Sequence, residues 1–554
     1  MKEILKKTIT LPFLAFSGTI LVYFTIILTL NRGISCDEGY YLLGYLRHQP
    51  LGNVSNEFHY IIQFITSQFS VEEVYLFRAL RLILNIVALL FFSISSYKWI
   101  KYRFNFQLSP MLYFSLIFLA GAMSFTYAAP TISFDHLQQM LYLCIMSMLF
   151  CVLSNIKQIW KLGCSMILGF LLVFSLINYV PSGILLITAI AIILFIENRE
   201  AKIVIPAFIL IGFIVGLFFY HFRIHDLIDV IHNLQTLMKV ESSGIVKHDS
   251  ASLIYEMIVA IGKLLLLYIP VFGIIILIQR LNISRVIVFL FYFSLALILI
   301  LLRQIYNLEG LLFFLPIAFL FGLLFKNKIQ FKEFLLSKDS MLMLIFIAFP
   351  FMGIFGTNQQ IYAKILLFSP FWMISFILLL SQFKNDSSIT PRYITGVFAI
   401  LLVSGYFYLG NFSRFQYYYT PRSSKKPFVD NVRYKSILVS NYQQSYYRDI
   451  CDTIRVHGFK ENDEILAFGE NQIAVYLLGG YFHGGLVYHC HQYAPIPKDK
   501  AQFLILFKNE EAPVTAILKN TGWNFPASYN RIEMRTMSEN MNDNLHKTII
   551  YYVK

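Results

Sequence analysis

The chain has 554 residues, of which 57% are hydrophobic and only 14% are charged. Soluble domains usually carry about 25% charged residues, so this composition excludes a protein that is water-soluble throughout. The net charge of +14 does not point to nucleic acid, because the Lys and Arg residues stand at the ends of apolar segments and are not clustered on one face.

Apolar segments follow one another from residue 11 to residue 410. With about 20 residues needed per crossing, they predict a polytopic α-helical membrane module over residues 1–410 with about thirteen transmembrane helices. The pair that meets at residues 178–182 can also be one broken helix, which would change the parity of the count. The expected spans lie near residues 11–30, 80–97, 109–128, 137–153, 162–178, 182–197, 203–220, 254–278, 286–302, 311–325, 341–355, 365–381 and 393–410.

The loops between these spans alternate in charge. Lys and Arg are denser in the loops on the side of the N-terminus, as at Lys98, Lys101 and Arg103 and again from Lys326 to Lys338. Short basic loops stay in the cytoplasm. We therefore expect a multi-pass protein of the bacterial inner membrane with a cytoplasmic N-terminus. An odd number of spans then places the C-terminal domain in the periplasm.

The end of the chain, residues 411–554, has the composition of a soluble domain. Its strand-like and helix-like segments alternate, which predicts a small α/β domain. Cys451 and Cys490 can form a disulfide there in an oxidising compartment, or they can stay reduced. The strand-like segments are residues 464–468, 503–507 and 548–553, and the helix-like ones are residues 471–478 and 513–519.

The first outer loop, residues 31–79, carries the most informative pattern. Asp37 and Glu38 follow directly after the first span, and the amphipathic run Tyr40–Leu46 comes next. Such a run predicts an interfacial helix with aromatic rings at headgroup depth. The two carboxylates can cap this helix, or one of them can act as a general base at the membrane surface.

A third carboxylate near Asp37 and Glu38 would allow this part of the protein to bind a metal ion. Asp135, in the short outer loop over residues 127–136, can join Asp37 in binding a divalent cation such as Mg²⁺ or Mn²⁺. Asp135 and His136 can equally cap the span that follows them. The sequence leaves both interpretations open.

Other outer loops supply groups that suit a phosphate or a sugar. Arg303 and Lys364 can hold a phosphate, although each can instead snorkel to the lipid headgroups. Tyr306 and Asn358 stand in the same two loops and can contact a sugar hydroxyl or be plain loop residues.

A retained first helix, an Asp-Glu pair that opens a long outer loop, about a dozen spans and an outer C-terminal domain together resemble the GT-C superfamily of integral-membrane glycosyltransferases. The likeness is to the lipid A aminoarabinose transferase and the protein O-mannosyltransferases, and it is best over residues 11–140. It implies that Asp37 is the catalytic acidic residue, Glu38 its neighbour in the motif and Asp135 the acidic residue of the second outer loop. Glu57 and His59 stand where relatives have Glu or His before the second span, at a different spacing from Asp37.

The resemblance implies a glycosyltransferase that moves a monosaccharide, with inversion, from a polyprenyl-phosphate donor to a cell-envelope acceptor on the outer face of the inner membrane. The acceptor would be lipopolysaccharide, O-antigen or another glycan or lipid, and no cofactor beyond the divalent cation is considered. Membrane lipid would be a partner and nucleic acid would not. The alternatives are a transporter or flippase of a lipid-linked or small polar substrate, and a non-enzymatic assembly or sensor protein. The residues expected to contact substrate are Glu57, His59, His136, Arg303, Tyr306, Asn358 and Lys364.

Overall fold

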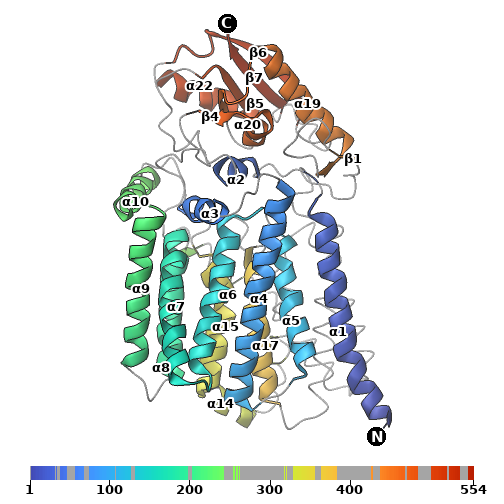
Figure 1. The fold of residues 1–554 in the computed structure, drawn as a ribbon, viewed down its shortest axis with the longest axis vertical. Helices are drawn as coiled ribbons and strands as arrows, with labels where there is room; N and C mark the ends of the chain where they lie inside the picture. The colour runs from blue at the N-terminus through green and yellow to red at the C-terminus, as the bar shows by residue number, and fades with distance from the viewer. Residues whose placement is uncertain are drawn as a thin grey trace.

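The computed structural model contains a bundle of long helices with a smaller α/β region on one of its ends (Figure 1). We call this end the domain side of the bundle and the other end the opposite side. The N-terminus lies on the opposite side (Figure 1). The structure describes residues 2–31, 33, 38–45, 57–67, 74–105, 108–126, 131–197, 203–242, 254–255, 258–259, 261–262, 317, 320, 328–355, 364–383, 426–427, 437–467, 471–483, 501–520, 523–536 and 547–554.

Six of the described helices are long and apolar enough to cross a membrane, so the chain is a multi-pass helical membrane protein. They are α1 (Lys2–Thr29), α4 (Val74–Phe104), α6 (Phe134–Leu153), α7 (Gln158–Asn178), α8 (Val180–Glu197) and α9 (Val204–Arg223).

Shorter helices complete the bundle at three further positions where spans were expected. Among the described residues the count thus stays below thirteen, and the spans expected near residues 254–278, 286–302, 311–325 and 393–410 lie almost wholly outside them. The shorter helices are α5 (Pro110–Ala122) with η1 (Met123–Thr126), α15 (Lys338–Gly353), and η2 (Ile365–Phe368) with α17 (Ser369–Ser381); α10 (Leu227–Ser242) and α14 (Lys328–Leu335) lie at the two ends of the bundle.

The apolar stretch around residue 180 forms two helices and not one broken helix. Tyr179 has an extended backbone with φ −156° and ψ 93°, which ends α7. Gly183 then packs so tightly that an added Cβ would lie 2.6 Å from the Cα of Leu176. The two helices therefore reverse direction at Tyr179 and count as separate spans.

Helices α7 and α9 approach each other through glycines. A Cβ added at Gly169 would lie 1.9 Å from the carbonyl oxygen of Ile209, and one at Gly212 would lie 2.0 Å from that of Met166. Small residues of this kind allow membrane helices to pack at backbone distance. This contact fixes α9 on α7 and so sets where the α9–α10 connection reaches the domain side.

Helix α4 is longer than the span expected at residues 80–97. It begins at Val74 and so includes Arg78, which was expected in the first outer loop, together with Arg81. Both arginines are buried, with exposed fractions of 0% and 2%, because they face other parts of the protein and not lipid. Charged side chains that are paired within the protein are tolerated at the end of a membrane helix, although a count of consecutive apolar residues would place them outside the span.

A helix is confirmed where the interfacial helix was expected, but its aromatic rings are buried in the protein and do not face outward. Residues Glu38–Tyr45 form α2, and a second short helix, α3, covers Phe58–Thr66. Both lie across the domain side of the bundle, between the long helices and the α/β region (Figure 1). All eight residues of α2 are buried, so this helix is an internal layer of the protein.

The C-terminal region is built on a five-stranded sheet with the order β4-β3-β5-β7-β6. Strand β3 is parallel to β4 and β5, whereas β7 is antiparallel to β5 and β6. The three expected strands and two expected helices are confirmed as β3, β5, β7, α20 and α22; β4, β6 and the amphipathic α19 were not anticipated. The elements are β1 (Lys426–Pro427), β2 (Leu438–Val439), α19 (Asn441–Val456), β3 (Glu464–Ala467), α20 (Gln472–Leu478), β4 (Tyr481–Phe482), β5 (Phe503–Phe507), η5 (Lys508–Glu510), α22 (Glu511–Asn520), β6 (Tyr529–Thr536) and β7 (Lys547–Val553).

Two backbone contacts join this region to the first outer loop. The amide of Gly33 donates to the carbonyl of Leu438 at 2.7 Å, and the amide of Leu438 donates to the carbonyl of Asn31 at 2.6 Å. Helix α2 packs on α20 so closely that a Cβ on Gly39 would lie 2.1 Å from the backbone nitrogen of Ile473. The α/β region therefore rests directly on the start of the first outer loop.

We expect Gly39→Ala to disturb this contact, because the clash is with backbone atoms that no side-chain rotation can move. The melting temperature of the purified protein should fall, and limited proteolysis should release the C-terminal region sooner. Gly163→Ala in α7 is the matched control, since an added Cβ there meets nothing within 4 Å. A Gly39→Ala protein as stable as this control would contradict the contact.

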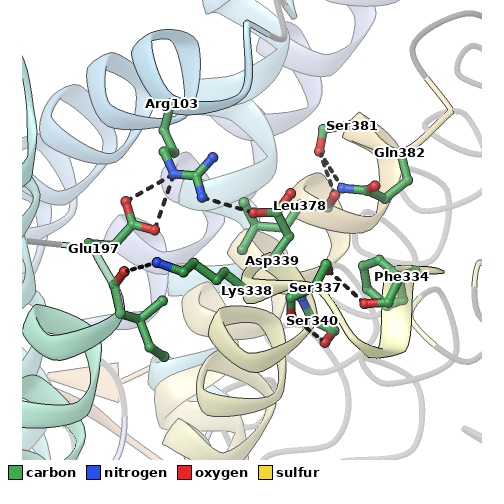
Figure 2. A network of polar contacts seen from close by, with 11 residues as sticks. Arg103, Glu197, Phe334, Ser337, Lys338, Asp339, Ser340, Leu378, Ser381 and Gln382 are labelled. Carbon is green, nitrogen blue, oxygen red and sulfur yellow. Dashed lines mark hydrogen bonds and ion pairs between the residues drawn. The ribbon is translucent and has the colours of Figure 1, made fainter. Parts of the chain in front are cut away.

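On the opposite side of the bundle, polar side chains tie three helices together (Figure 2). The guanidinium of Arg103, in the last turn of α4, contacts Glu197 of α8 at 3.0 Å and Asp339 of α15 at 3.1 Å. Lys338 donates to the carbonyl of Ile196 at 3.2 Å. These contacts hold the ends of α4, α8 and α15 together away from the α/β region.

Candidate functional site

Most of the described residues that were expected to act on substrate lie at the domain side, around α2, α3 and the start of α6. Two contacts make this a continuous site: the hydroxyl of Tyr45 donates to the carbonyl of Ile132 at 3.1 Å, and the rings of Phe58 and Phe134 lie 5.8 Å apart. The interfacial helices therefore pack on the residues that open α6.

Glu38 is held by Arg78 in a buried bidentate ion pair. The carboxylate accepts from Nε at 2.8 Å and from Nη2 at 2.6 Å, and both side chains have an exposed fraction of 0%. The same guanidinium donates to the carbonyls of Leu30 and Gly33 at 2.8 and 2.9 Å. This arrangement fixes the end of α1 and the start of α2 to α4, and it directs the Glu38 carboxylate into the protein.

Asp135 and Lys364 form a second ion pair. The ammonium nitrogen lies 3.1 Å from Oδ2 of Asp135, with exposed side-chain fractions of 8% and 9%. The ammonium also lies 5.2 Å from the centroid of the Phe134 ring. Lys364 is therefore held between a protein carboxylate and an aromatic ring. Asp135 belongs to the first turn of α6 because that helix begins at Phe134, earlier than expected.

His136 completes the start of α6 as part of a capping box with Ser133. Its Nε2 lies 2.6 Å from Nη2 of Arg81, which also donates to the carbonyl of Ser124 at 2.8 Å. Nδ1 lies 2.8 Å from the Ser133 hydroxyl and accepts from the Ser133 backbone amide at 3.3 Å. The helix-cap interpretation thus holds for His136, whose two nitrogens are occupied by protein groups.

Glu57 connects the first outer loop with α9 and α10. Its carboxylate accepts from the hydroxyl of Tyr220 at 2.9 Å and from Nδ2 of Asn233 at 3.2 Å, and it lies 3.0 Å from Nδ1 of His225. The His225 ring stacks on Tyr60 at 3.7 Å with an angle of 8° between the planes. All of these contacts are within the protein, so Glu57 acts here as a buried anchor.

His59 is enclosed by aromatic rings and is fully buried. The nearest rings are those of Phe58 at 4.2 Å, Tyr40 at 4.5 Å and Tyr45 at 5.3 Å. Neither ring nitrogen has a hydrogen-bond partner in the described part of the chain. Burial lowers the pKa of His59 to about 3, so the imidazole is neutral in the folded protein near neutral pH.

This pKa predicts a pH dependence of stability. Unfolded His titrates near pH 6.5, whereas folded His59 resists protonation down to about pH 3, so the unfolded chain binds the proton first. Stability should therefore fall as the pH drops below 6.5, by about 1.4 kcal/mol per pH unit. In His59→Leu this part of the slope should disappear in denaturation series between pH 7 and pH 5. His232→Leu, at an exposed position of α10, should keep it; equal slopes in wild type and His59→Leu would contradict the prediction.

Several expected site residues fall outside the described residues: Asp37, Arg303, Tyr306 and Asn358. Among the residues that the structure describes, no group of three His, Cys, Asp or Glu side chains could hold a metal ion. The cation site expected at Asp37 and Asp135 includes one residue outside this set and stays a prediction. Cys451 is a free and buried thiol, and burial raises its pKa to about 12. Cys490, its partner in the disulfide alternative, lies outside the described residues.

Arg78 and Arg81 are the important site residues that the sequence argument did not single out. Together with Asn85 they stand three and four positions apart, and all three are buried on the face of α4 toward the site. This spacing places side chains on one helical face. A polar stripe at helical period, at the start of an apolar segment, was the signal that could have identified them.

Comparison with models of known protein families finds no family that the chain matches, and comparison with curated proteins finds no match either. What the chain does must therefore be inferred from the site itself.

Proposed function

We propose that the chain is a GT-C-type glycosyltransferase of about thirteen spans that moves a monosaccharide from a polyprenyl-phosphate carrier to a cell-envelope acceptor. The observation that carries the proposal is the nearly buried Asp135–Lys364 pair beside Phe134, whose ring contacts Phe58 of α3. A cation at the end of a membrane bundle, next to helices that lie across that end, suits a ligand with its phosphate at headgroup depth and its chain in lipid.

In the proposed reaction, Asp37 takes the proton from the acceptor hydroxyl as that oxygen bonds to the anomeric carbon. The bond between this carbon and the phosphate oxygen breaks, and its electron pair stays on the phosphate. Lys364, helped by Arg303, stabilises the charge that grows on the leaving phosphate. Attack from the face opposite the phosphate inverts the anomeric centre.

The other residues receive supporting roles in this proposal. Arg78 holds Glu38 directly next to Asp37 in the chain, so we assign Glu38 to shaping the loop and not to proton transfer. Glu57 and His136 are occupied by protein partners and would frame the site. Tyr306 and Asn358 remain candidates for sugar hydroxyls.

The direct test is transfer of radiolabelled sugar by the purified full-length protein from a panel of polyprenyl-phosphate monosaccharides to lipopolysaccharide-derived acceptors. We expect one donor to be used, and that donor identifies the sugar. Repetition with a chelator decides whether a divalent cation takes part. A panel with no transfer to any envelope acceptor would reject the proposal.

A transporter is the competing function, and the placement of charge argues against it. Transporters hold ionisable groups near the middle of the membrane. In the described spans such groups stand near helix ends, as Arg78 and Arg103 do in α4 and Glu197 does in α8. Flux of a polar solute into proteoliposomes, in the absence of sugar transfer, would favour the transporter.

We further propose that the N-terminus is cytoplasmic and the α/β region periplasmic. Val456 in α19 has an exposed fraction of 80% and is suited to a reporter cysteine. In cells with a permeabilised outer membrane, a membrane-impermeant maleimide should label Val456→Cys without detergent. Labelling that needs lysis would reverse the orientation.

A further inference from the structure

The Asp135–Lys364 pair has unused bonding capacity on the cation. An ammonium group has three donors. In the described part of the chain the only oxygen at hydrogen-bonding distance from the Lys364 nitrogen is Oδ2 of Asp135, at 3.1 Å, and its other neighbour is the face of the Phe134 ring. A cation with an exposed fraction of 6% and one oxygen partner is poorly satisfied.

A phosphate group would satisfy this cation better than one carboxylate oxygen does. It offers at least two unesterified oxygens, and as a monoester it carries more charge near neutral pH than a single carboxylate. The two anions cannot share the ammonium without leaving the buried site with net negative charge, so binding of one disfavours the other.

Asp135 has a second place for its charge. Ser133 is the N-cap of α6, so Asp135 is the second residue of this helix, next to amides that have no intrahelical partner. A carboxylate is favoured at a helix N-terminus. A change of side-chain rotamer would therefore move the charge from Lys364 to the end of its own helix.

We propose that Asp135 is a placeholder for the phosphate of the ligand: the phosphate takes Lys364 and releases the Asp135 carboxylate into the site. This inference rests on the proposed function only for the identity of the phosphate as that of a polyprenyl carrier. It makes ligand binding a switch, because Asp135 becomes available to orient an acceptor hydroxyl only after the donor has arrived.

The chain contains a matched control for this pair. Asp339 is likewise the second residue of a helix, α15, with Ser337 as its N-cap, and its Oδ1 lies 3.1 Å from Nη2 of Arg103. This pair lies on the opposite side of the bundle and shares its cation with Glu197 (Figure 2). Asp339→Asn thus removes an equivalent charge far from the proposed phosphate site.

The experiment measures binding of radiolabelled polyprenyl phosphate to the full-length protein in nanodiscs of fixed lipid composition. We expect Asp135→Asn to bind about tenfold more tightly than wild type, because no carboxylate competes for Lys364. Asp339→Asn should bind as wild type does, and Lys364→Gln should bind at least tenfold more weakly. Inorganic phosphate, as competitor, shows whether the site recognises the phosphate alone or needs the lipid chain.

Melting temperatures give a second measurement, which can be made even if one of the variants does not fold. Without ligand, Asp135→Asn should melt below wild type, and inorganic phosphate should raise its melting temperature more than that of wild type or of Asp339→Asn. If Asp135→Asn does not fold, Lys364→Gln decides: loss of the phosphate-induced shift supports the proposal, and an undiminished shift overturns it.

The outcomes separate this proposal from the glycosyltransferase proposal. Equal or weaker binding by Asp135→Asn, or binding by none of the proteins, overturns the placeholder even if sugar transfer is found. If the affinities follow the predicted order but no donor supports sugar transfer, the placeholder role of Asp135 is supported and the glycosyltransferase proposal is rejected.

Discussion

Replacing Asp37 with Asn should lower sugar transfer by about 10²- to 10⁴-fold, the range typical of a lost general base. Asn keeps the size and most hydrogen bonds of Asp but cannot take a proton at neutral pH. The loss should appear in the rate at saturating donor, because the donor phosphate is bound by other groups. Initial rates with purified protein across a donor titration measure it.

The control for Asp37→Asn is an acidic residue on the same side of the bundle that has no assigned role. Asp229 in α10 has an exposed side-chain fraction of 66%, so Asp229→Asn should transfer sugar at nearly the native rate. Both variants should elute and melt as wild type does. Native transfer by a correctly folded Asp37→Asn protein would remove Asp37 from the mechanism.

Replacing Arg78 with Met should destabilise the protein by about 3–5 kcal/mol, the usual effect of breaking a buried ion pair on one side only. The substitution leaves the Glu38 carboxylate buried without its partner and removes the donors to Leu30 and Gly33. Unfolding titrations in mixed micelles, followed by tryptophan fluorescence, measure the change. Arg223→Met, at an exposed position at the end of α9, should have little effect.

A double variant separates the two causes of this loss. Glu38→Leu combined with Arg78→Met removes the unpaired charge, so it should recover part of the stability. The recovery should be incomplete, because the carbonyls of Leu30 and Gly33 still lack their donors. Full recovery would show that the carbonyl contacts contribute nothing, and no recovery would show that the ion pair is not the source of the stability.

Apolar length and period were sufficient to predict much of the fold. The described long helices, the interfacial helix at Glu38–Tyr45 and the alternating elements of the α/β region all follow local rules of burial and period. The start of α4 was expected too late in the chain because that part of the helix carries Arg78. A hydropathy scale cannot anticipate that a distant carboxylate or carbonyl will compensate a charge.

The candidate site was predictable only as a set of residue types. Asp135 and Lys364 were each expected near substrate, but their pairing joins parts of the chain more than two hundred residues apart and has no local signature. The same holds for Glu57, whose partners Tyr220 and His225 lie 163 and 168 residues further along the chain. Which polar group finds which partner depends on how the helices pack, and the packing is not visible in one sequence.

The backbone pairing of Gly33 with Leu438 has a consequence for how the protein is made. The first outer loop is among the earliest segments to leave the ribosome, yet its partners Leu438 and Ile473 come from the last quarter of the chain. Contacts of such sequence separation form late. The start of the loop therefore lacks these partners until every later span has been inserted. If translation stops early, the α/β region that packs on the loop is missing. Completion of the site thereby reports that synthesis has passed Ile473.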